Sequence, residues 1–350
     1  MSLITVEIST KNRYEVLCLA LMSICQQSYK PTRLIIFDDS DLHIRTDLRQ
    51  LSIYKNIFFL LEKNKVQWEI RFTEQRGQVR NHIEALDLCK TKYIFRMDDD
   101  CVLSNNTLEV LLNVIEKDDK IGAVGCFVEH PDIDFPESIT SPFIEDVLFK
   151  YAIQFHKFEG IKETQHLYST FLSRVSAAKN CYPTNLSKIS HREESTFSTK
   201  LKRKGYKLLV TFDSTILHMR ASEGGIRVFN KNEDAKMWYE DDLRFKERLK
   251  AWEINLTNWL PVVCNEAVGD HFILKSIIPE IKQKNPNSKI FLGTVFPDIW
   301  WDMPDLNLSS IAGARILLGD ISRFNPYRYG YENDGKISLL DCYKKIYNLI

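Results

Sequence analysis

The segment KYIFRMDDDC, from Lys92 to Cys101, joins a short run rich in apolar and aromatic residues to three consecutive aspartates. Its composition predicts a buried β-strand that delivers Asp98, Asp99 and Asp100 to the end of that strand. Carboxylate oxygens are the ligands that Mg²⁺ and Mn²⁺ prefer, and these ions usually also bind substrate phosphates. A solvated acidic turn is the alternative interpretation of the aspartates taken alone, so the surrounding pattern decides between the two.

Strand-like and helix-like segments alternate on both sides of this run. A strand–helix–strand unit forms a parallel pair, so the alternation predicts an α/β sheet with helices on both faces. Ligands of such sheets bind beyond the carboxyl ends of the strands, where residues 38–41 and 98–100 are both expected. We expect strands at residues 3–10, 32–41, 67–74, 92–100 and 121–129, and helices at 14–28, 77–91 and 104–118.

The second half of the chain predicts a further helix at 192–205, ended by a glycine, and one or two strands at 206–219. Residues 221–255 are charged and helix-prone, and a new strand–helix–strand pattern starts after them. We therefore expect a first domain at residues 1–225, a helical linker at 226–255 and a small α/β domain at 256–350.

The composition suits a globular protein of 350 residues with two domains, 44% hydrophobic and 27% charged residues. Its 47 basic side chains balance its 47 acidic ones, which removes the electrostatic argument for a dedicated nucleic-acid binder. The eight cysteines are scattered, contain no CxxC pair and are expected to be reduced. Neither a signal peptide nor a transmembrane segment is predicted, so the cytoplasm is the expected location.

Four ordered blocks resemble the inverting GT-A glycosyltransferases of family 2. They are VEISTKNR, IIFDDSD, GQVRNHIEALDLCKTKYIFRMDDD and HREESTFSTKLKRKGY, and together they cover about residues 3–225. Ser9 stands where the family usually has a proline, and Ser40 replaces a glycine. The resemblance implies a GT-A nucleotide-diphospho-sugar transferase fold, with a mixed, mainly parallel sheet between helices, and a nucleoside diphosphate sugar as donor, with a UDP-sugar favoured.

The resemblance also implies which residues bind the donor. Thr10, Asp38 and Asp39 match the positions that hold the nucleotide base and ribose. Arg80 matches an arginine that faces the nucleotide, and Asp99 is grouped with these donor-binding residues.

A metal site is implied by the match of Asp98 and Asp100 to the DxD pair of the family. Because Asp99 lies between them, either adjacent pair of aspartates could supply the ligands. His218 follows an apolar strand, where relatives often place a further metal ligand, although a lone histidine there is commonly a packed or surface residue. Neutral imidazole suits Mn²⁺ better than Mg²⁺, whereas carboxylates suit both ions, so both remain candidates.

Glu193 and Glu194 open a predicted helix. Acidic residues at this position complement the helix dipole without any further role. The resemblance places the pair in the catalytic site and makes Glu194 the general base that deprotonates the acceptor. Glu194 stands for the usual aspartate and adds one methylene, so the acceptor hydroxyl must lie slightly further away to stay within hydrogen-bond reach.

Residues 262–297 resemble something else, the opening of a family 9, heptosyltransferase-type GT-B glycosyltransferase. They contain a strand, a GD turn with Gly269 and Asp270, a helix and a second strand. The resemblance implies a small Rossmann-like domain equivalent to part of one GT-B half. Acceptor recognition or formation of a homodimer is the role expected of it.

These features predict a metal-dependent inverting glycosyltransferase that acts by single displacement on an acceptor hydroxyl. The acceptor stays open between a carbohydrate, a lipid-linked sugar, a protein and a modified DNA base, with nucleic acid not favoured by the neutral charge. A non-catalytic sugar- or nucleotide-binding scaffold is the alternative. A related nucleotidyltransferase would begin with a glycine-rich phosphate loop, and ISTKNRYEVL at residues 8–17 contains no glycine.

Overall fold

The computed structural model describes residues 3–129, 159–251 and 259–350, apart from short gaps at 165, 168, 220, 222, 227–230, 301, 304–305, 312–313, 315–319 and 332–335. The chain divides into two compact units. One contains residues 1–134 and 158–245, and the other contains residues 135–157 and 246–350. Within the predicted linker at 226–255, residues 227–230 and 252–255 lie outside the described part.

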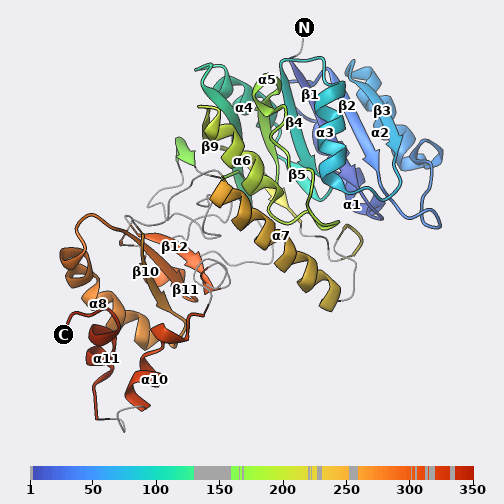
Figure 1. The fold of residues 1–350 in the computed structure, drawn as a ribbon. Helices are drawn as coiled ribbons and strands as arrows, with labels where there is room; N and C mark the ends of the chain where they lie inside the picture. The colour runs from blue at the N-terminus through green and yellow to red at the C-terminus, as the bar shows by residue number, and fades with distance from the viewer. Residues whose placement is uncertain are drawn as a thin grey trace. The chain divides into compact units, whose positions relative to one another are not determined.

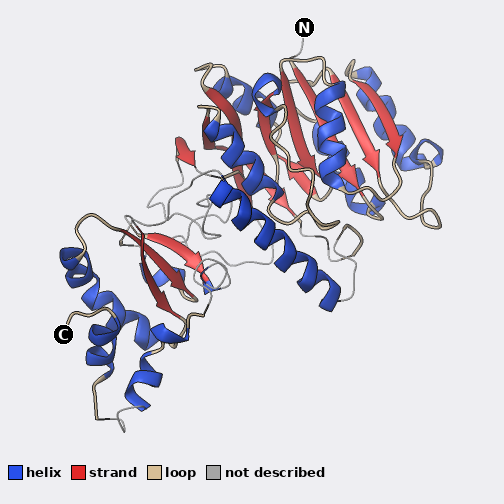
Figure 2. Ribbon diagram, viewed as in Figure 1, coloured by secondary structure: helices blue, strands red, loops and turns tan. Residues whose placement is uncertain are grey.

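The first unit is built on one mixed sheet with helices on both of its faces (Figure 1, Figure 2). The strand order is β3-β2-β1-β4-β8-β6-β9-β5, and β7 pairs with β9. Its strands are β1 (Ile4–Thr10), β2 (Arg33–Asp38), β3 (Gln67–Phe72), β4 (Tyr93–Asp98), β5 (Cys101–Leu103), β6 (Ile121–Glu129), β7 (Ile161–Thr164), β8 (Phe171–Arg174) and β9 (Lys207–His218).

Parallel pairing brings the acidic strand ends to one edge of this sheet. β1 is parallel to both β2 and β4, so that Thr10 pairs with Asp38 and Ser9 pairs with Asp98. β8 is inserted antiparallel between β4 and β6. The result is the predicted mixed, mainly parallel sheet, and the predicted fold class is confirmed.

Both faces of the central strands are covered. In β1 the apolar residues Ile4, Val6 and Ile8 are fully buried, and Glu7 between them is only 1% exposed. The helices of the unit are α1 (Tyr14–Cys25), α2 (Ser52–Lys63), α3 (Gln78–Leu88), α4 (Thr107–Ile115), α5 (Val175–Ala178), α6 (Glu193–Arg203) and most of α7 (Lys231–Ala251), with a 3₁₀ turn η1 (Leu48–Gln50).

The second unit is a small α/β structure with the parallel strand order β10-β11-β12. Gly269 lies inside the first turn of its helix α8 rather than in a turn before it. None of the helices in the described part of the chain is long and apolar enough to cross a membrane. The elements are β10 (Trp259–Cys264), α8 (Val268–Lys284), β11 (Lys289–Thr294), η2 (Pro297–Trp300), β12 (Asn307–Ser310), η3 (Ser322–Phe324), α10 (Pro326–Tyr331) and α11 (Leu339–Ile346).

Candidate functional site

The carboxyl ends of β1 and β4 bring Thr10 against the three aspartates. Oγ1 of Thr10 donates a hydrogen bond to Oδ2 of Asp99 at 2.7 Å. Arg13, in the loop after β1, places Nη1 at 3.3 Å from Asp99 Oδ1 and 3.2 Å from Asp100 Oδ2. Thr10 and Asp99, both predicted donor-binding residues, therefore lie in direct contact beside a permanent cation.

Asp98 makes a different set of contacts. Its Oδ2 accepts a hydrogen bond from Oγ of Ser169 at 2.8 Å, and its Oδ1 lies 3.6 Å from Nη2 of Arg96. The strand β4 ends at Asp98, and Asp99 and Asp100 form the turn that follows. The change in backbone direction explains why neighbouring aspartates face different partners.

Asp100 and His218 lie together because β5 and β9 pair antiparallel with Cys101 opposite His218. Nε2 of His218 is 3.2 Å from Oδ1 of Asp100. Ligand atoms of Asp100, Cys101 and His218 all lie within 4.8 Å of one another. Burial raises the pKa of the Cys101 thiol well above its usual range, so this cysteine is a poor ligand at neutral pH. The carboxylate and the imidazole that remain fit a divalent ion such as Mn²⁺.

The two turn aspartates differ in their protonation. Burial raises the pKa of Asp99 to about 7, and Arg13 opposes this only in part. Burial also acts to raise the pKa of Asp100, but its hydrogen bond with His218 and the charge of Arg13 outweigh burial and lower it. Asp100 is therefore the more readily ionised of the two, and its position beside His218 makes it the better candidate for a metal ligand.

A glycine-containing segment covers the loop that carries Arg13. The guanidinium of Arg13 donates to the backbone oxygens of Ala221 and Glu223, at 3.0 Å each. Gly224 and Gly225 both have positive φ, and a Cβ atom on Gly225 would lie 2.6 Å from Cζ of Arg13. Glycine adopts these positive φ values without strain, and Arg13 joins the segment to the aspartates.

Asp38 and Asp39 are buried at the end of β2 and hold the adjoining loops. Asp39 accepts hydrogen bonds from Thr73 Oγ1 at 2.7 Å and from the backbone nitrogen of Gly77 at 2.9 Å. Asp38 accepts from the hydroxyl of Tyr14 at 2.7 Å. These carboxylates therefore fix the start of α1 and the loop before α3, beside the predicted nucleotide site.

Arg80 lies on α3 and is exposed. The arginine that the fold brings to Asp39 is instead Arg76, whose backbone nitrogen donates to Asp39 Oδ1 at 3.0 Å. The Arg76 guanidinium lies 5.6 Å from the centre of the Phe37 ring and donates to Asn81 at 2.7 Å. No hydrogen bond or ion pair among the described residues links Arg80 to the aspartates.

The two glutamates at the start of α6 differ sharply in burial. The side chain of Glu193 is 1% exposed and that of Glu194 is 21% exposed. Nη2 of Arg96 lies 2.7 Å from Oε1 of Glu193 and 3.2 Å from Oε1 of Glu194. Burial raises the pKa of Glu193 to about 7, against the opposing charge of Arg96. Glu194 is thus the member of the pair that solvent, and hence a substrate, can reach.

Helix α7 holds the loop that leads into these glutamates. Asp241 accepts hydrogen bonds from the backbone nitrogen of Ser187 at 2.7 Å and from that of His191 at 3.0 Å. Asp242 accepts from Nε of Arg192 at 2.6 Å. The helix is therefore part of the framework of the first unit around Glu193 and Glu194, a role that its charged sequence does not signal.

A mixed, mainly parallel sheet with carboxylates and an imidazole gathered at its carboxyl edge is the architecture of a GT-A nucleotide-diphospho-sugar transferase. Residues 5–177 match the family model described as glycosyl transferase family 2. This match assigns residues 5–177 to a family 2 glycosyltransferase domain. No curated protein sequence matches the chain.

Solved structures of similar fold include those of S. aureus TarS. The crystal structure of TarS 1-349 in complex with UDP-GlcNAc matches with a TM-score of 0.51 and 16% identity, over 99% of this chain and 91% of that chain. The crystal structure of S. aureus TarS matches with a TM-score of 0.46 and 16% identity, over 99% of this chain and 55% of that chain. The chain thus spans about half of the length of that TarS chain, and the likeness concerns the fold.

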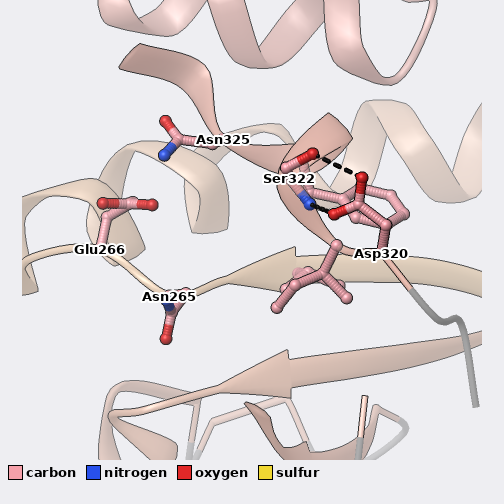
Figure 3. A pocket seen from close by; sticks show the side chains of 8 residues that line it. Asn265, Glu266, Asp320, Ser322 and Asn325 are labelled. Carbon is pink, nitrogen blue, oxygen red and sulfur yellow. Dashed lines mark hydrogen bonds between the residues drawn. The ribbon is translucent and has the colours of Figure 1, made fainter. Parts of the chain in front are cut away.

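The second unit contains a cavity of about 400 Å³ at the carboxyl end of β10. Asn265 and Glu266 line it from the end of β10, and Asp320, Ser322 and Asn325 line it from the segment around η3 (Figure 3). Both oxygens of Asp320 accept hydrogen bonds from Ser322, at 2.8 Å each.

Asp270, the aspartate of the predicted GD turn, is 3% exposed. Its Oδ2 accepts a hydrogen bond from the hydroxyl of Tyr327 at 2.9 Å. Its carboxylate thus joins α8 to α10 and is not among the groups that line the cavity.

Proposed function

We propose that this chain is a metal-dependent inverting glycosyltransferase that moves a sugar from a nucleoside diphosphate sugar to an acceptor hydroxyl. The observation that carries the proposal is that Asp100, within the stretch that matches family 2, pairs with His218, and that the solvent-accessible Glu194 lies in the same unit. A UDP-sugar is the favoured donor, because the TarS 1-349 structure of similar fold contains UDP-GlcNAc.

The donor nucleotide is held, in this proposal, by Thr10, Asp38, Asp39, Arg80 and Asp99. The hydrogen bond between Thr10 and Asp99 supports a joint role for that pair. The contacts of Asp38 and Asp39 with the loops after β1 and before α3 support their placement beside the nucleotide.

Asp100 and His218 would hold the divalent ion, Mn²⁺ or Mg²⁺, with Asp98 as the third predicted ligand. The ion would neutralise charge on the nucleoside diphosphate as it leaves. Arg13 would add a second positive charge at this place, because its guanidinium already lies beside Asp99 and Asp100.

Glu194 accepts the proton of the acceptor hydroxyl. The acceptor oxygen then forms a bond to the anomeric carbon while the bond from that carbon to the diphosphate oxygen breaks, and the diphosphate keeps the electron pair. One displacement inverts the anomeric configuration, and no covalent enzyme intermediate is involved. The partial exposure of Glu194 supports this assignment over the enclosed Glu193.

Release of nucleoside diphosphate from a panel of nucleotide sugars, with and without Mn²⁺, tests the proposal. We expect metal-dependent release that is strongest with a UDP-sugar and is lost in Asp98→Ala and Asp100→Ala. Full activity in both variants would contradict the metal assignment. Nucleotide binding seen as thermal stabilisation, without turnover for any donor, would favour a non-catalytic scaffold instead.

For the second unit we propose a role in acceptor recognition, with homodimer formation as the alternative. The parallel strand–helix–strand unit β10–α8–β11 supports its resemblance to part of a family 9 GT-B enzyme. Light scattering of the full chain separates the alternatives, because a monomer would exclude the homodimer. Glycan, lipid-linked sugar, protein and modified DNA bases are then compared as acceptors.

A further inference from the structure

Arg96 lies beside the carboxylates that the proposed reaction uses. It stands on β4 two residues before Asp98, so both side chains leave the strand on the same face. Its side chain is buried, and Nη2 alone approaches Glu193 at 2.7 Å, Glu194 at 3.2 Å and Asp98 at 3.6 Å. A single guanidinium nitrogen therefore connects the end of a strand to the start of helix α6.

The contacts with these three carboxylates are made by Nη2 and not by the other two nitrogens of the guanidinium. Nε and Nη1 are buried and form no hydrogen bond with the described carboxylates. The guanidinium lies 5.5 Å from the centre of the Phe171 ring, which supplies an aromatic surface but no acceptor. A buried cation needs compensating anions, so the position of Arg96 and the positions of its carboxylate partners depend on each other.

Glu193 is the carboxyl group that holds Arg96 from the helix side. It also accepts a hydrogen bond from Gln78, and Nε2 of His82 lies 4.0 Å from its Oε1. Nδ1 of His82 is in turn 2.5 Å from Oε1 of Glu7, the residue that pairs with Arg96 in the β1–β4 register. Arg96 is therefore enclosed by a buried polar network whose side chains come from two strands and two helices.

We infer that Arg96 is a positioning residue, which fixes the carboxylate of Glu194 relative to Asp98, and that Glu193 serves to hold Arg96. The inference rests on the proposed function, because it takes Glu194 as the base. Glu194 has one more rotatable bond than the aspartate usual at this position, and that bond adds conformational freedom. A contact with a buried, immobile guanidinium removes this freedom and keeps the base at a defined reach.

Arg174 provides a matched control. It lies on the neighbouring strand β8, is 7% exposed, and stacks on Tyr93 as Arg96 stacks on Phe171. Its hydrogen bonds go to the Tyr93 hydroxyl and to backbone oxygens of the α4–β6 region, away from the glutamates. Loss of either arginine removes a buried cation from the same sheet, but only one of them contacts the proposed base.

The test compares Arg96→Gln, Arg96→Lys and Arg174→Gln by steady-state kinetics, with UDP binding and thermal unfolding measured on the same full-length proteins. We expect Arg96→Gln to lower kcat on the order of a hundredfold, while the donor KM and the UDP affinity change by less than about threefold. Arg96→Lys should lower kcat about tenfold, because an ammonium cannot reproduce the planar contacts. Arg174→Gln should lower the melting temperature and leave kcat unchanged.

Glu194→Gln and the double variant R96K/E194Q complete the design. If Arg96 acts through Glu194, Arg96→Lys should have little further effect once Glu194 is replaced. Independent, multiplicative losses would overturn the inference, and so would an unchanged kcat in folded Arg96→Lys or an equal loss of UDP affinity. Full activity in Glu194→Gln would instead refute the base assignment of the proposed function. Arg96→Lys keeps the charge and decides the question if Arg96→Gln does not fold.

Discussion

Oδ1 of Asp242 accepts a hydrogen bond from Nε of Arg192 at 2.6 Å, and this contact ties α7 to the residue before Glu193. Arg192 has a φ of 69°, in the left-handed region that non-glycine residues seldom adopt. The ion pair therefore stabilises a strained entry into α6. A helix that is distant in sequence thereby fixes the point at which α6 begins, and with it the positions of Glu193 and Glu194.

Replacement of Asp242 should expose this dependence as a pH effect. Burial acts to raise the pKa of Asp242, but His191 and Arg192 outweigh it and lower the pKa. A carboxylate with a lowered pKa contributes stability that is present at neutral pH and is lost as the pH falls through its folded-state pKa. Asp242→Asn should cost about 1.5–3 kcal/mol at pH 7.

The difference in unfolding free energy between wild type and Asp242→Asn should stay constant from pH 7 down to about pH 4 and shrink below that, as the pH falls towards the folded-state pKa of Asp242. Urea unfolding at a series of pH values measures it. Asp47→Asn is the control, because Asp47 forms an ion pair with Arg49 at the surface. A constant difference across the pH range would contradict the assigned ionisation.

The contribution of Glu193 to the unfolding free energy should change with pH in the opposite direction to that of Asp242. Its pKa is raised to about 7 by burial. The folded protein holds this proton more tightly than the unfolded chain, so the contribution is fully present below about pH 4.3 and is lost as the pH rises to about 7. The Glu193→Gln variant has an uncharged side chain at this position at all pH values, as the protonated glutamate does.

The stability of Glu193→Gln relative to wild type should therefore increase as the pH rises from about 4.5 to 7. Chemical unfolding of both proteins over this range provides the measurement. Parallel pH profiles for the two proteins would show that Glu193 does not titrate in this window.

Removal of His218 should weaken metal binding without unfolding the domain. The imidazole lies 3.2 Å from Asp100 and is the nitrogen donor of the candidate metal group. His218→Ala should lower Mn²⁺ affinity at least about tenfold. It should also reduce the preference for Mn²⁺ over Mg²⁺, since imidazole favours Mn²⁺.

Isothermal titration with each ion measures both affinities, and His43→Ala, at an exposed loop position, is the control. Identical Mn²⁺ affinities for His218→Ala and wild type would remove His218 from the metal site.

Gly225→Ala should impair donor binding through Arg13. The new Cβ would lie 2.6 Å from Cζ of Arg13, so the guanidinium has to shift, and the shift disturbs its contacts with Asp99 and Asp100. Gly160→Ala is a close control, because Gly160 also has a positive φ and a Cβ atom added there would have no heavy atom within 4 Å. Both variants carry a backbone cost of about 1–2 kcal/mol, because both positions have positive φ.

Only Gly225→Ala is expected to raise the donor KM, by about tenfold for a loss of about 1.4 kcal/mol in binding. Donor titrations under identical metal concentrations compare the two variants. An equal KM for both would mean that the Gly225 segment does not act on the donor site through Arg13.

Local patterns are sufficient to predict the first strands and helices. The apolar runs at 3–10, 32–41, 92–100 and 121–129 correspond to β1, β2, β4 and β6. The helix predicted at 104–118 is shorter at both ends in the structure, where α4 starts at Thr107 and ends at Ile115. Helix α2 and strand β8 are not among the predicted elements, and β8 gains its place only from non-local pairing with β4 and β6.

The residues around the proposed base are harder to predict. In ITVEIST the alternation of apolar and polar residues suggests a solvent-facing Glu7, whereas both faces of β1 are covered and Glu7 is buried. Arg96 likewise looks like an ordinary polar position within an apolar strand. Its partners come from α6, about a hundred residues later, and such contacts leave no periodic signal in the sequence.

The spacing of Arg96 and Asp98 has a consequence for which changes the protein can tolerate. β4 is paired along both edges, with β1 on one side and β8 on the other, so it cannot slide by one residue without loss of both ladders. Alternation makes the parity of the spacing decisive: a deletion of Met97 would turn one of the two side chains to the opposite face. Met97 should therefore accept replacement by other apolar residues, while a one-residue insertion or deletion there should abolish activity.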